Sequence, residues 1–484
     1  MRLSRRRFLQ AGAAGAAGAA LLADAGCSME ASGSREHMNV LLLIVDTLRP
    51  DHVGAYGSPQ VKTPNVDSLA ARGIRFNRAF PEAMVTIPAR RSIFTTKRIF
   101  PFRHWKPNLE LGTSPGWLPI DDVEHTFTSE LRRHGYWVAQ VSDNPHLGFT
   151  HAYGRFRASF DHWKSVPGQA GTFRPASTVS LKTVYEWLPP FLRDDRYVPG
   201  MREYLANSGA GVREDETCAA RVYKEAADTI DAARVRQPFC LVVDCFDPHE
   251  PWSPVEKYIR MYRDPTYTGT KIGVTRYGFA RNFSEAQIRE LHAIYAAEVT
   301  QTDRWLGHFL DRFHASGLAD NTVILFLSDH GYLLGERGYT GKVPSQLHPE
   351  LAQVPFVIVH PDRKAAGETN TYFASTHDVG PTLLSMVGIR PPSWMEGTDL
   401  SPVLDGGQPP ERRDFHYGGM YNRFFTRTDD WVLIGDNRGQ ERTLYDLRND
   451  PDEFFDVVHE HPDVNRELYR TILDAAGGPL PYYE

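Results

Sequence analysis

The sequence predicts an α/β fold with a large mixed, mostly parallel sheet flanked by helices, followed by a small C-terminal α+β subdomain. Five segments are apolar without alternation, which is the pattern of strands buried on both faces of a parallel sheet. Helical patterns separate these segments, and each segment ends in polar residues, where open α/β sheets bind their ligands. The five segments are "NVLLLIVDTLRPDH", "YWVAQVSDN", "PFCLVVDCFDPHEP", "NTVILFLSDHG" and "VPFVIVHP".

Three of the intervening segments predict helices. The first, "TPNVDSLAARG", has a proline near its start and a glycine at its end. The second, residues 284–317, has apolar residues at three-to-four spacing and opens on Ser284, with Gln287 three residues later as in a capping box. The third, "STHDVGPTLLSMVGI", predicts a short helix that is capped by Asp378.

Two regions differ from this alternating pattern. Residues 158–215 are rich in proline, glycine and charge, so we expect a long insertion without a clear strand, helical at "KTVYEWLPPFL" and facing the substrate. From residue 401 the chain has short alternating strands and a last helix at "PDVNRELYRTILDAA". We therefore expect a catalytic domain over residues 38–400 and a C-terminal subdomain over residues 401–484.

The overall composition is that of a globular protein. Of 484 residues, 41% are hydrophobic and 24% are charged, and the net charge is −6, which argues against a nucleic-acid-binding protein. The four cysteines show no disulfide framework or zinc-ligand spacing. Cys240 and Cys245 lie at odd separation on one predicted strand, so they should face opposite sides of the sheet and cannot pair.

The first residues have the pattern of an export signal. "SRRRFLQ" precedes a Gly/Ala-rich run that is too short to cross a bilayer, so residues 1–37 are interpreted as a twin-arginine signal peptide and linker. This predicts a periplasmic or extracellular protein without a transmembrane span. Ala23-Asp24-Ala25 fits a cleavage site, and lipid attachment at Cys27 is the alternative.

Three polar residues at predicted strand ends indicate a cation site. Asp46 ends the first run, and Asp329 and His330 follow a later one. Because the ends of parallel strands meet at one edge of the sheet, two carboxylates and an imidazole there can converge on a divalent cation.

From Asn39 to its C-terminus the chain resembles the sulfatase family, within the alkaline phosphatase superfamily. The resemblance rests on motifs in a fixed order, and one of them alone would be weak. They are "VDTLRPDHVGAYG", "KTPNVDSLAARGIRFNRAF", "TIPARRSIFTTKR", "FDPHEPW", "LSDHGYLLGERGYTGK", "VPFVIVHP", "DVGPTLLSMVGI" and "LYDLRNDPDE".

The resemblance implies roles for particular residues. Metal-ligand positions of the family fall on Asp46, Thr86, Asp329 and His330, whereas Thr47 replaces a second acid that many members have. The nucleophile position is Thr86, and the other positions implied to be catalytic are Arg90, His249 and Lys342. Arg90 would steady the nucleophile and its oxyanion, and the other two would hold the ester oxygens and assist the leaving group.

The remaining family positions match less well. The lysine-containing "GKWH" region has no clean counterpart, and "VSDNPHLG" aligns loosely with it, which makes Asn144 and His146 candidate substrate contacts. By resemblance the cofactor is one divalent metal, Ca²⁺ first, with Mn²⁺, Mg²⁺ and Zn²⁺ as alternatives. A second cation held by Asp247, His249 and His377 stays open.

The threonine at position 86 changes what the resemblance implies about the reaction. Sulfatases make formylglycine at this position from cysteine or serine, so no formylglycine is expected here. A threonine ester must be cleared by water or another acceptor, as in phosphodiesterases of the superfamily. We therefore expect a hydrolase of small-molecule or glycan esters, with phosphate mono- or diesters favoured over sulfate esters. The alternatives are a formylglycine-independent sulfuric ester hydrolase and a non-catalytic ester-binding protein.

Overall fold

The computed structural model describes residues 37–112, 114–169, 174–208 and 213–484. The predicted twin-arginine motif, its cleavage site and Cys27 lie outside the described residues. His37–Glu484 form one unit. Within the described residues, no helix has the length and apolar character needed to cross a membrane.

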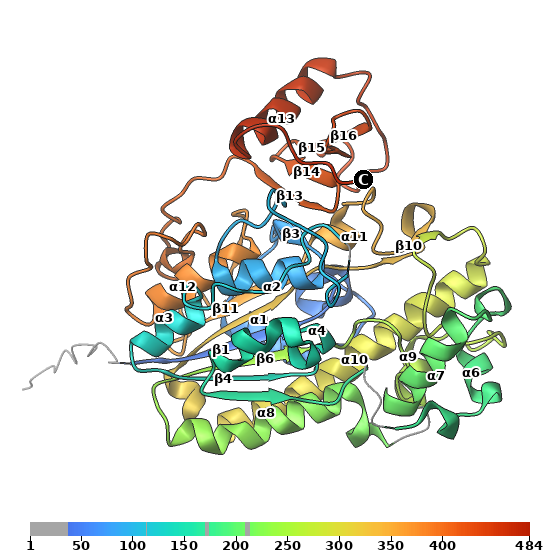
Figure 1. The fold of residues 1–484 in the computed structure, drawn as a ribbon, viewed down its shortest axis with the longest axis horizontal. Coiled ribbons are helices and arrows are strands. Elements are labelled where there is room, and N and C mark those ends of the chain that lie inside the picture. The colour runs from blue at the N-terminus through green and yellow to red at the C-terminus, as the bar shows by residue number, and fades with distance from the viewer. Residues whose placement is uncertain (1–36, 113, 170–173, 209–212) are drawn as a thin grey trace, which may run out of the picture. The chain divides into compact units, whose positions relative to one another are not determined.

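An eight-stranded sheet forms the centre of the fold (Figure 1). Its strand order is β12-β2-β11-β8-β1-β6-β4-β5, and β11 alone runs against its neighbours, so the predicted mixed, mostly parallel sheet is confirmed. The strands are β1 (Asn39–Val45), β2 (Ile74–Phe76), β4 (Trp137–Ser142), β5 (His162–Ser165), β6 (Phe239–Cys245), β8 (Thr322–Ser328), β11 (Phe356–Val359) and β12 (Thr369–Asn370).

Helices cover both faces of this sheet, which explains why its strands are apolar without alternation. Side chains of β1 point alternately into two apolar clusters. One cluster includes residues of α1 (Pro64–Arg72), α8 (Cys218–Arg234) and α10 (Glu285–Ala315). The other includes residues of α2 (Thr86–Thr95), α3 (Phe127–Arg133) and α12 (Val379–Met386). Cys240 and Cys245 belong to different clusters, as predicted, and both are free thiols.

The expected absence of a strand in residues 158–215 was wrong. β5 lies in this segment and pairs in parallel with β4 at the edge of the sheet. It is short, and all four of its residues are only half-buried, so it lacks the continuous apolar run that marks the inner strands. The helices of this segment are α6 (Leu181–Trp187) and α7 (Tyr197–Ser208).

Short elements complete the main part of the fold. The remaining helices are α4 (Pro145–Phe149), α5 (Gly154–Ala158), α9 (Glu256–Tyr262) and α11 (Pro349–Ala352). A small three-stranded sheet has the order β7-β10-β9, with β7 (Gly278–Phe279), β9 (Leu333–Leu334) and β10 (Tyr339–Gly341).

The C-terminal strands form a second sheet, drawn in orange and red in Figure 1. The strands β13 (His416–Met420), β14 (Arg423–Arg427), β15 (Trp431–Asp436) and β16 (Arg442–Asp446) are antiparallel, and α13 (Pro462–Ala475) packs on them. A fifth strand, β3 (Ala83–Met84), joins the edge of this sheet in parallel with β13. The C-terminal sheet therefore holds the chain directly before Thr86.

Of the two predicted helix caps, the one at α10 is confirmed and the one at α12 is not. The capping box at the start of α10 is confirmed, because Ser284 Oγ accepts from Gln287 N and Gln287 Oε1 accepts from Ser284 N. Asp378 as the side-chain cap of α12 is wrong. Its carboxylate instead accepts from the backbone N–H groups of Ser375 and Thr398, each at 2.8 Å. It thus closes the preceding turn rather than the helix.

We predict that Ser284→Ala lowers the free energy of unfolding by about 1 kcal/mol, because it removes the acceptor for one of the orphan N–H groups of α10. Urea unfolding of both proteins measures the difference. Ser284→Asp is the matched control, because aspartate retains a capping acceptor. An equal loss in both variants would contradict the role of the cap.

Candidate active site

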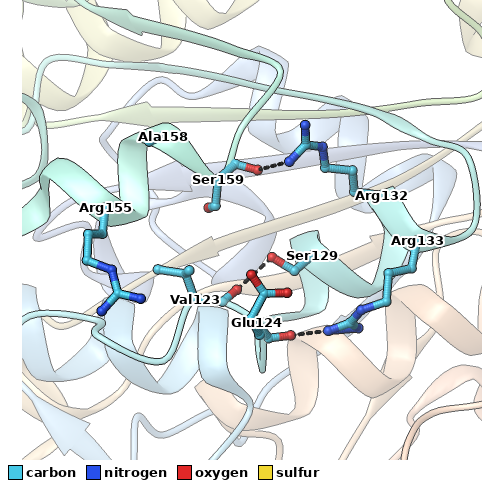
Figure 2. Close-up of a pocket in the computed structure, with 8 residues that line it drawn as sticks. All are labelled: Val123, Glu124, Ser129, Arg132, Arg133, Arg155, Ala158 and Ser159. Atoms are coloured by element: carbon cyan, nitrogen blue, oxygen red, sulfur yellow. Dashed lines mark hydrogen bonds between the residues drawn. The ribbon is translucent and has the colours of Figure 1, made fainter.

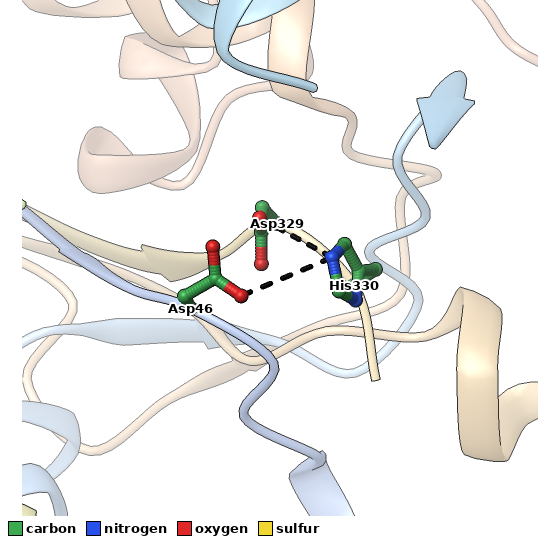
Figure 3. A group of neighbouring side chains, drawn as sticks. All are labelled: Asp46, Asp329 and His330. Atoms are coloured by element: carbon green, nitrogen blue, oxygen red, sulfur yellow. Dashed lines mark ion pairs between the residues drawn. The ribbon is translucent and has the colours of Figure 1, made fainter. Parts of the chain in front are cut away.

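Three predicted metal ligands converge at the carboxyl end of the central sheet (Figure 3). Asp46 follows β1, and Asp329 and His330 follow β8, which is the neighbour of β1 in the sheet. All three residues are fully buried, and one ligand atom from each lies within 4.8 Å of the others. His330 Nε2 lies 3.5 Å from Asp329 Oδ2 and 3.9 Å from Asp46 Oδ1.

The hydrogen bonds of this group leave ligand atoms available. His330 Nδ1 lies 2.9 Å from the carbonyl of Gly331, to which it can only donate, so Nε2 turns a lone pair toward the carboxylates. Asp46 Oδ2 is buried and accepts no hydrogen bond, although it has an ion pair with Arg90 Nη1. Two carboxylates and one imidazole with these free atoms could hold a divalent cation with oxygen-rich coordination.

The two carboxylates are held in different states. Burial raises the pKa of Asp46 well above its usual value, and the negative charge of Asp329 adds to this effect. Burial acts on Asp329 in the same direction, but the neighbouring His330 and Arg90 hold its pKa well below its usual value. Burial also lowers the pKa of His330 to about 4. The imidazole is therefore neutral at pH 7, as a metal ligand must be.

Thr86 is the first residue of α2 and lies beside this group. Its side chain is buried, and Oγ1 lies 3.4 Å from His330 Nε2. The first N–H groups of a helix have no partner within the helix and favour negative charge nearby. The threonine hydroxyl therefore lies where a negatively charged group would be stabilised.

Arg90 connects the helix to three carboxylates. It lies one turn after Thr86 on the same side of α2, and its Nη1 donates to the Thr86 carbonyl and to Asp329. The same nitrogen lies 3.0 Å from Asp46 Oδ2. Nε and Nη2 donate to the two oxygens of Asp244, at 3.1 Å and 2.7 Å. This paired contact fixes the plane of the guanidinium.

Lys342 and His249, the two residues whose motifs imply a role at the ester oxygens, lie side by side. Lys342 Nζ is 2.9 Å from His249 Nε2, and it also contacts both oxygens of Glu250 and the hydroxyl of Tyr277. Burial lowers the pKa of His249 well below its usual value, and the charge of Lys342 acts in the same direction. The histidine is thus neutral, and the proton of this pair is on the lysine.

Asn144 and His146 lie at the start of α4, beyond the end of β4. Asn144 Oδ1 caps this helix by accepting from His146 N at 3.0 Å, while its Nδ2 is buried without a partner. His146 packs against Trp117, and its pKa is lowered to about 4 by burial and by the charges of Arg90 and Lys342. Asn144 therefore has a structural role as a cap and one free donor.

The second-cation group does not assemble. In the part of the chain that the structure describes, only Asp46, Asp329 and His330 bring three metal-ligand atoms together. Both oxygens of Asp247 already accept hydrogen bonds, from Gln169 Nε2 and Ala219 N. His377 lies in another part of the fold, beside Arg413.

Sequence reasoning missed the residues that hold Arg90 and Lys342, the two cations predicted to be catalytic. Asp244 binds Arg90, and Glu250 and Tyr277 bind Lys342. Asp244 interrupts the run "LVVDCF", and an acid inside a fully buried strand is the signal that could have identified it, because such a charge needs a partner. Glu250 stands next to His249, but nothing in the sequence singles out Tyr277.

The hollow in Figure 2 lies away from this site. It has a volume of ≈ 400 Å³ between α3 and α5, and none of its lining residues is a predicted site residue. Arg132 and Arg133 at its rim are already paired, with Asp161 and Glu130. We assign no function to it.

Comparison with known proteins identifies related chains along almost the whole length. The family profile "Sulfatase" matches residues 38–389. A second profile, "N-sulphoglucosamine sulphohydrolase, C-terminal", matches residues 335–476. An arylsulfatase of Clostridium perfringens is 25% identical over 466 residues, covering 90% of this chain and 92% of the relative. An N-acetylglucosamine-6-O-sulfatase of Bacteroides thetaiotaomicron is 22% identical and covers 94% and 88%.

Solved structures share the fold. A phosphonate monoester hydrolase of Agrobacterium radiobacter has a TM-score of 0.71 at 22% identity, covering 91% of this chain and 95% of that chain. A protein in complex with its substrate D-glucosamine-2-N,6-O-disulfate has a TM-score of 0.68 at 19% identity, covering 91% and 97%. At these identities the likeness concerns the fold alone.

We predict that Asp329→Ala abolishes binding of a divalent metal, because it removes one of three ligands and leaves Asp46 and His330 too few to hold the ion. Metal content per protein after dialysis against Ca²⁺, Mg²⁺, Mn²⁺ or Zn²⁺ measures the effect, and circular dichroism checks the fold. Asp311→Ala, an exposed acid on α10, is the control. Unchanged metal content in Asp329→Ala would place the ion elsewhere.

Proposed function

The chain belongs to the sulfatase family, and we propose that it is a metal-dependent hydrolase of phosphate or sulfate esters in which Thr86 is the nucleophile. As a member of this family it is a sulfuric or phosphoric ester hydrolase. The single observation that carries the proposal is the position of the Thr86 hydroxyl. It lies at the start of a helix, 3.4 Å from His330 Nε2 and next to the Asp46–Asp329 pair.

Different residues of this site can contribute to different steps of an ester hydrolysis. The Thr86 hydroxyl loses its proton to solvent and a bond forms between Oγ1 and the phosphorus or sulfur, while the bond from that atom to the ester oxygen breaks, with its electron pair on the leaving oxygen. Thr86 Oγ1 takes up a proton again when the threonine ester is cleaved. Arg90 and the first N–H groups of α2 stabilise the charge on the transferred group. Water then attacks the threonine ester and releases the acid.

A divalent metal fits the proposed reaction. Asp46, Asp329 and His330 would hold it, and its charge would lower the pKa of the Thr86 hydroxyl. Ca²⁺ is our first candidate because the ligand group is rich in carboxylate oxygen. Arg90 Nη1 contacts both carboxylates from the other side and would share them with the ion.

Lys342 is the proposed donor of the proton to the leaving oxygen. It carries the proton in its pair with the neutral His249, and Glu250 and Tyr277 hold its ammonium in place. Three neighbours thus fix the direction of a side chain that is otherwise long and flexible. His249 packs flat on Phe246, which fixes the imidazole in turn.

The threonine favours phosphate mono- or diesters over sulfate esters. One hydroxyl cannot expel sulfate by collapse to an aldehyde, whereas water can clear a phosphorylated threonine. The phosphonate monoester hydrolase among the similar structures hydrolyses phosphorus esters on this fold, and several relatives carry the name of a glycan sulfatase. A glycan or small-molecule ester is therefore the proposed substrate, and formylglycine-independent hydrolysis of a sulfate ester is the second candidate.

A non-catalytic ester-binding protein is the alternative from another class. Loss of function at position 86 would relax the constraint on the neighbouring residues. Instead, Asp46, Arg90, Asp329, His330 and Lys342 keep a closely packed network of buried charges, which is costly to maintain without a use. Binding of esters without any turnover would favour the alternative.

We predict that the purified protein carries unmodified threonine at position 86 and that Thr86→Ala lowers ester turnover by several orders of magnitude, because only positioning and electrostatics remain. Mass spectrometry of the peptide gives the first result. Assays with aryl phosphate monoesters, diesters and sulfates, each with Ca²⁺, Mg²⁺, Mn²⁺ and Zn²⁺, give the second and identify the ester class. Thr95→Ala, on the same helix, is the matched control. Wild-type rates in Thr86→Ala would exclude threonine as the nucleophile.

We predict that Thr86→Cys, produced together with a formylglycine-generating enzyme, gains sulfate-ester turnover relative to phosphate-ester turnover wherever the cysteine is converted. The hydrated aldehyde supplies the second hydroxyl that threonine lacks. The ratio of the two rates, with conversion measured by mass spectrometry, is the readout. An unchanged ratio in converted protein would contradict our explanation of the threonine.

We also propose export by the twin-arginine pathway, with the mature protein in the periplasm or outside the cell, either cleaved near Ala25 or lipidated at Cys27. Replacing Arg5 and Arg6 by lysines should leave the protein in the cytoplasm of its host. Immunoblots of cell fractions measure this, and the mass of the mature N-terminus separates cleavage from lipidation. Normal export of the variant would contradict the twin-arginine interpretation.

A further inference from the structure

A cationic pocket lies at the C-terminal end of α2, and we call it the α2 pocket. Its volume is ≈ 370 Å³. Four parts of the chain line it, namely the end of α2 with the loop up to Trp105, the segment at Leu118, the segment at Glu396, and the C-terminal subdomain at Tyr417 and Ala475. None of its lining residues belongs to the site around Thr86, although the pocket and the site share one helix.

The charges around the α2 pocket are unbalanced. Four lining residues are cations, and Glu396 is the one carboxylate among the lining residues. The cations are Arg91, Lys97, Arg98 and Arg103. Glu396 accepts from the backbone N–H of Arg98, so it neutralises none of the four side chains directly. The pocket therefore has a positive potential that favours an anionic ligand.

Among the described residues, none of these four side chains forms an ion pair with a carboxylate, although Glu82 and Asp121 act electrostatically on Arg91, and Lys97 acts on Asp122. Arg91 donates from Nη1 to the carbonyl of Gly116, and burial lowers its pKa, which means that its charge is held at a cost. The Lys97 ammonium makes no hydrogen bond or ion pair among the described residues. Arg98 and Arg103 are instead held by backbone carbonyls. An anion entering the pocket would thus meet cations that are still available.

Aromatic rings form the walls of the α2 pocket. Phe100, Phe102, Trp105 and Tyr417 all line it, but Phe100, Phe102 and Tyr417 are buried and Arg98 covers the Tyr417 ring, so the half-buried Trp105 offers the accessible ring. The indole N–H of Trp105 is buried without an acceptor. An orphan donor of this kind costs free energy unless a ligand satisfies it. Ring faces bind apolar C–H surfaces, and cations and N–H donors bind oxyanions. A sugar residue that carries a sulfate or a carboxylate offers both.

The geometry of α2 relates the pocket to the reaction. Arg90 and Arg91 are consecutive, so their side chains leave the helix about 100° apart, one toward the carboxylates of the site and the other toward the pocket. Lys97 lies beyond the last residue of α2, and the ten residues of the helix span ~15 Å along its axis, so a group held at Lys97 is too far from Thr86 to be the ester that reacts.

We propose that the α2 pocket binds a second anionic sugar residue of a polyanionic oligosaccharide substrate. This rests on the proposed function, because the same oligosaccharide would present its ester to Thr86. Binding at a remote residue supplies free energy that positions the ester. The recognised group is the sulfate or carboxylate of the sugar, held by Lys97 and Arg91, with the ring against the aromatic wall.

Equilibrium binding of the full chain to size-fractionated dextran sulfate oligosaccharides tests the proposal. Neutral dextran of the same length and inorganic sulfate are the comparison ligands. We expect Lys97→Ala to weaken dextran sulfate binding about fivefold by removing a charged donor. Trp105→Phe, which keeps a ring but removes the N–H, should weaken it about threefold. Lys182→Ala, on exposed α6, removes the same charge elsewhere and should leave binding unchanged.

The outcomes separate this proposal from the proposed function. Binding is measured directly, so absence of ester turnover would count against Thr86 catalysis and not against the pocket. Equal weakening in Lys97→Ala and Lys182→Ala would show a general charge effect and overturn the proposal. Binding of inorganic sulfate as tight as that of dextran sulfate, with the same loss in Lys97→Ala, would show an isolated anion site and also overturn it. Equal binding of neutral dextran would exclude recognition of the anionic group.

Discussion

The burial of Arg90 is the constraint on which the rest of the site depends. Asp46, Asp244 and Asp329 are all fully buried at the ends of adjacent strands, and Arg90 contacts each of them. Burial raises the pKa of Asp46, and the negative charge of Asp329 raises it further, against the opposing effect of Arg90. Charges in such a place persist only with partners, because each has lost its hydration. A cation between Asp46 and Asp329 would complete this balance, which supports the proposed metal site.

The position of Thr86 follows from the same interaction. Residues four apart on a helix lie on one face, so a helix that aims Arg90 at the carboxylates also brings Thr86 to them. The helix start is fixed from outside the main sheet, since β3 pairs with β13 just before it. Glu82 then holds the far end, accepting from the backbone N–H groups of Ile99 and Phe100. The C-terminal sheet is thus part of the support of the site as well as of the wall of the α2 pocket.

The inner strands and the strand-end residues could be predicted because burial on both faces forces a continuous apolar run, and the acids that interrupt it stand out. The edge strand β5 was not predicted, because a half-buried strand carries no continuous apolar run. The roles of Asp244 and Tyr277 were not predicted either. These residues contact Arg90 and Lys342, which are distant from them in the sequence. Likewise, Asp378 has the residue type of a helix cap, but tertiary contacts with Thr398 decide where its oxygens point.

One departure from the family pattern, at Thr47, has a local physical explanation. Thr96, by contrast, ends α2 with φ 56°, a left-handed conformation that glycine adopts more readily. Thr47, where many members have a second acid, has φ 60° and donates to Asp46 Oδ1, while its backbone N–H donates to Asp329. It therefore supports both carboxylates without adding a third charge. A site with one fewer acid and an extra hydroxyl donor carries less negative charge around its proposed cation. The cation would then attract the negatively charged transferred group more strongly.

The side chain of Thr86 carries both a hydroxyl and a methyl group on Cβ. A β-branched residue has few χ1 conformations in a helix, so the hydroxyl is oriented before substrate binds. The methyl group occupies the second position on Cβ, where the hydrated aldehyde of formylglycine carries its other hydroxyl. In the proposed reaction, release of the acid requires an external water. That water must attack the phosphorus or sulfur from the side opposite its bond to Thr86 Oγ1. In the proposed reaction, the hydrogen bond between the leaving-group residues Lys342 and His249 lets one proton serve both steps. The pair donates it as the ester oxygen departs, and a water that later attacks returns it, so the site ends each turnover in its starting state.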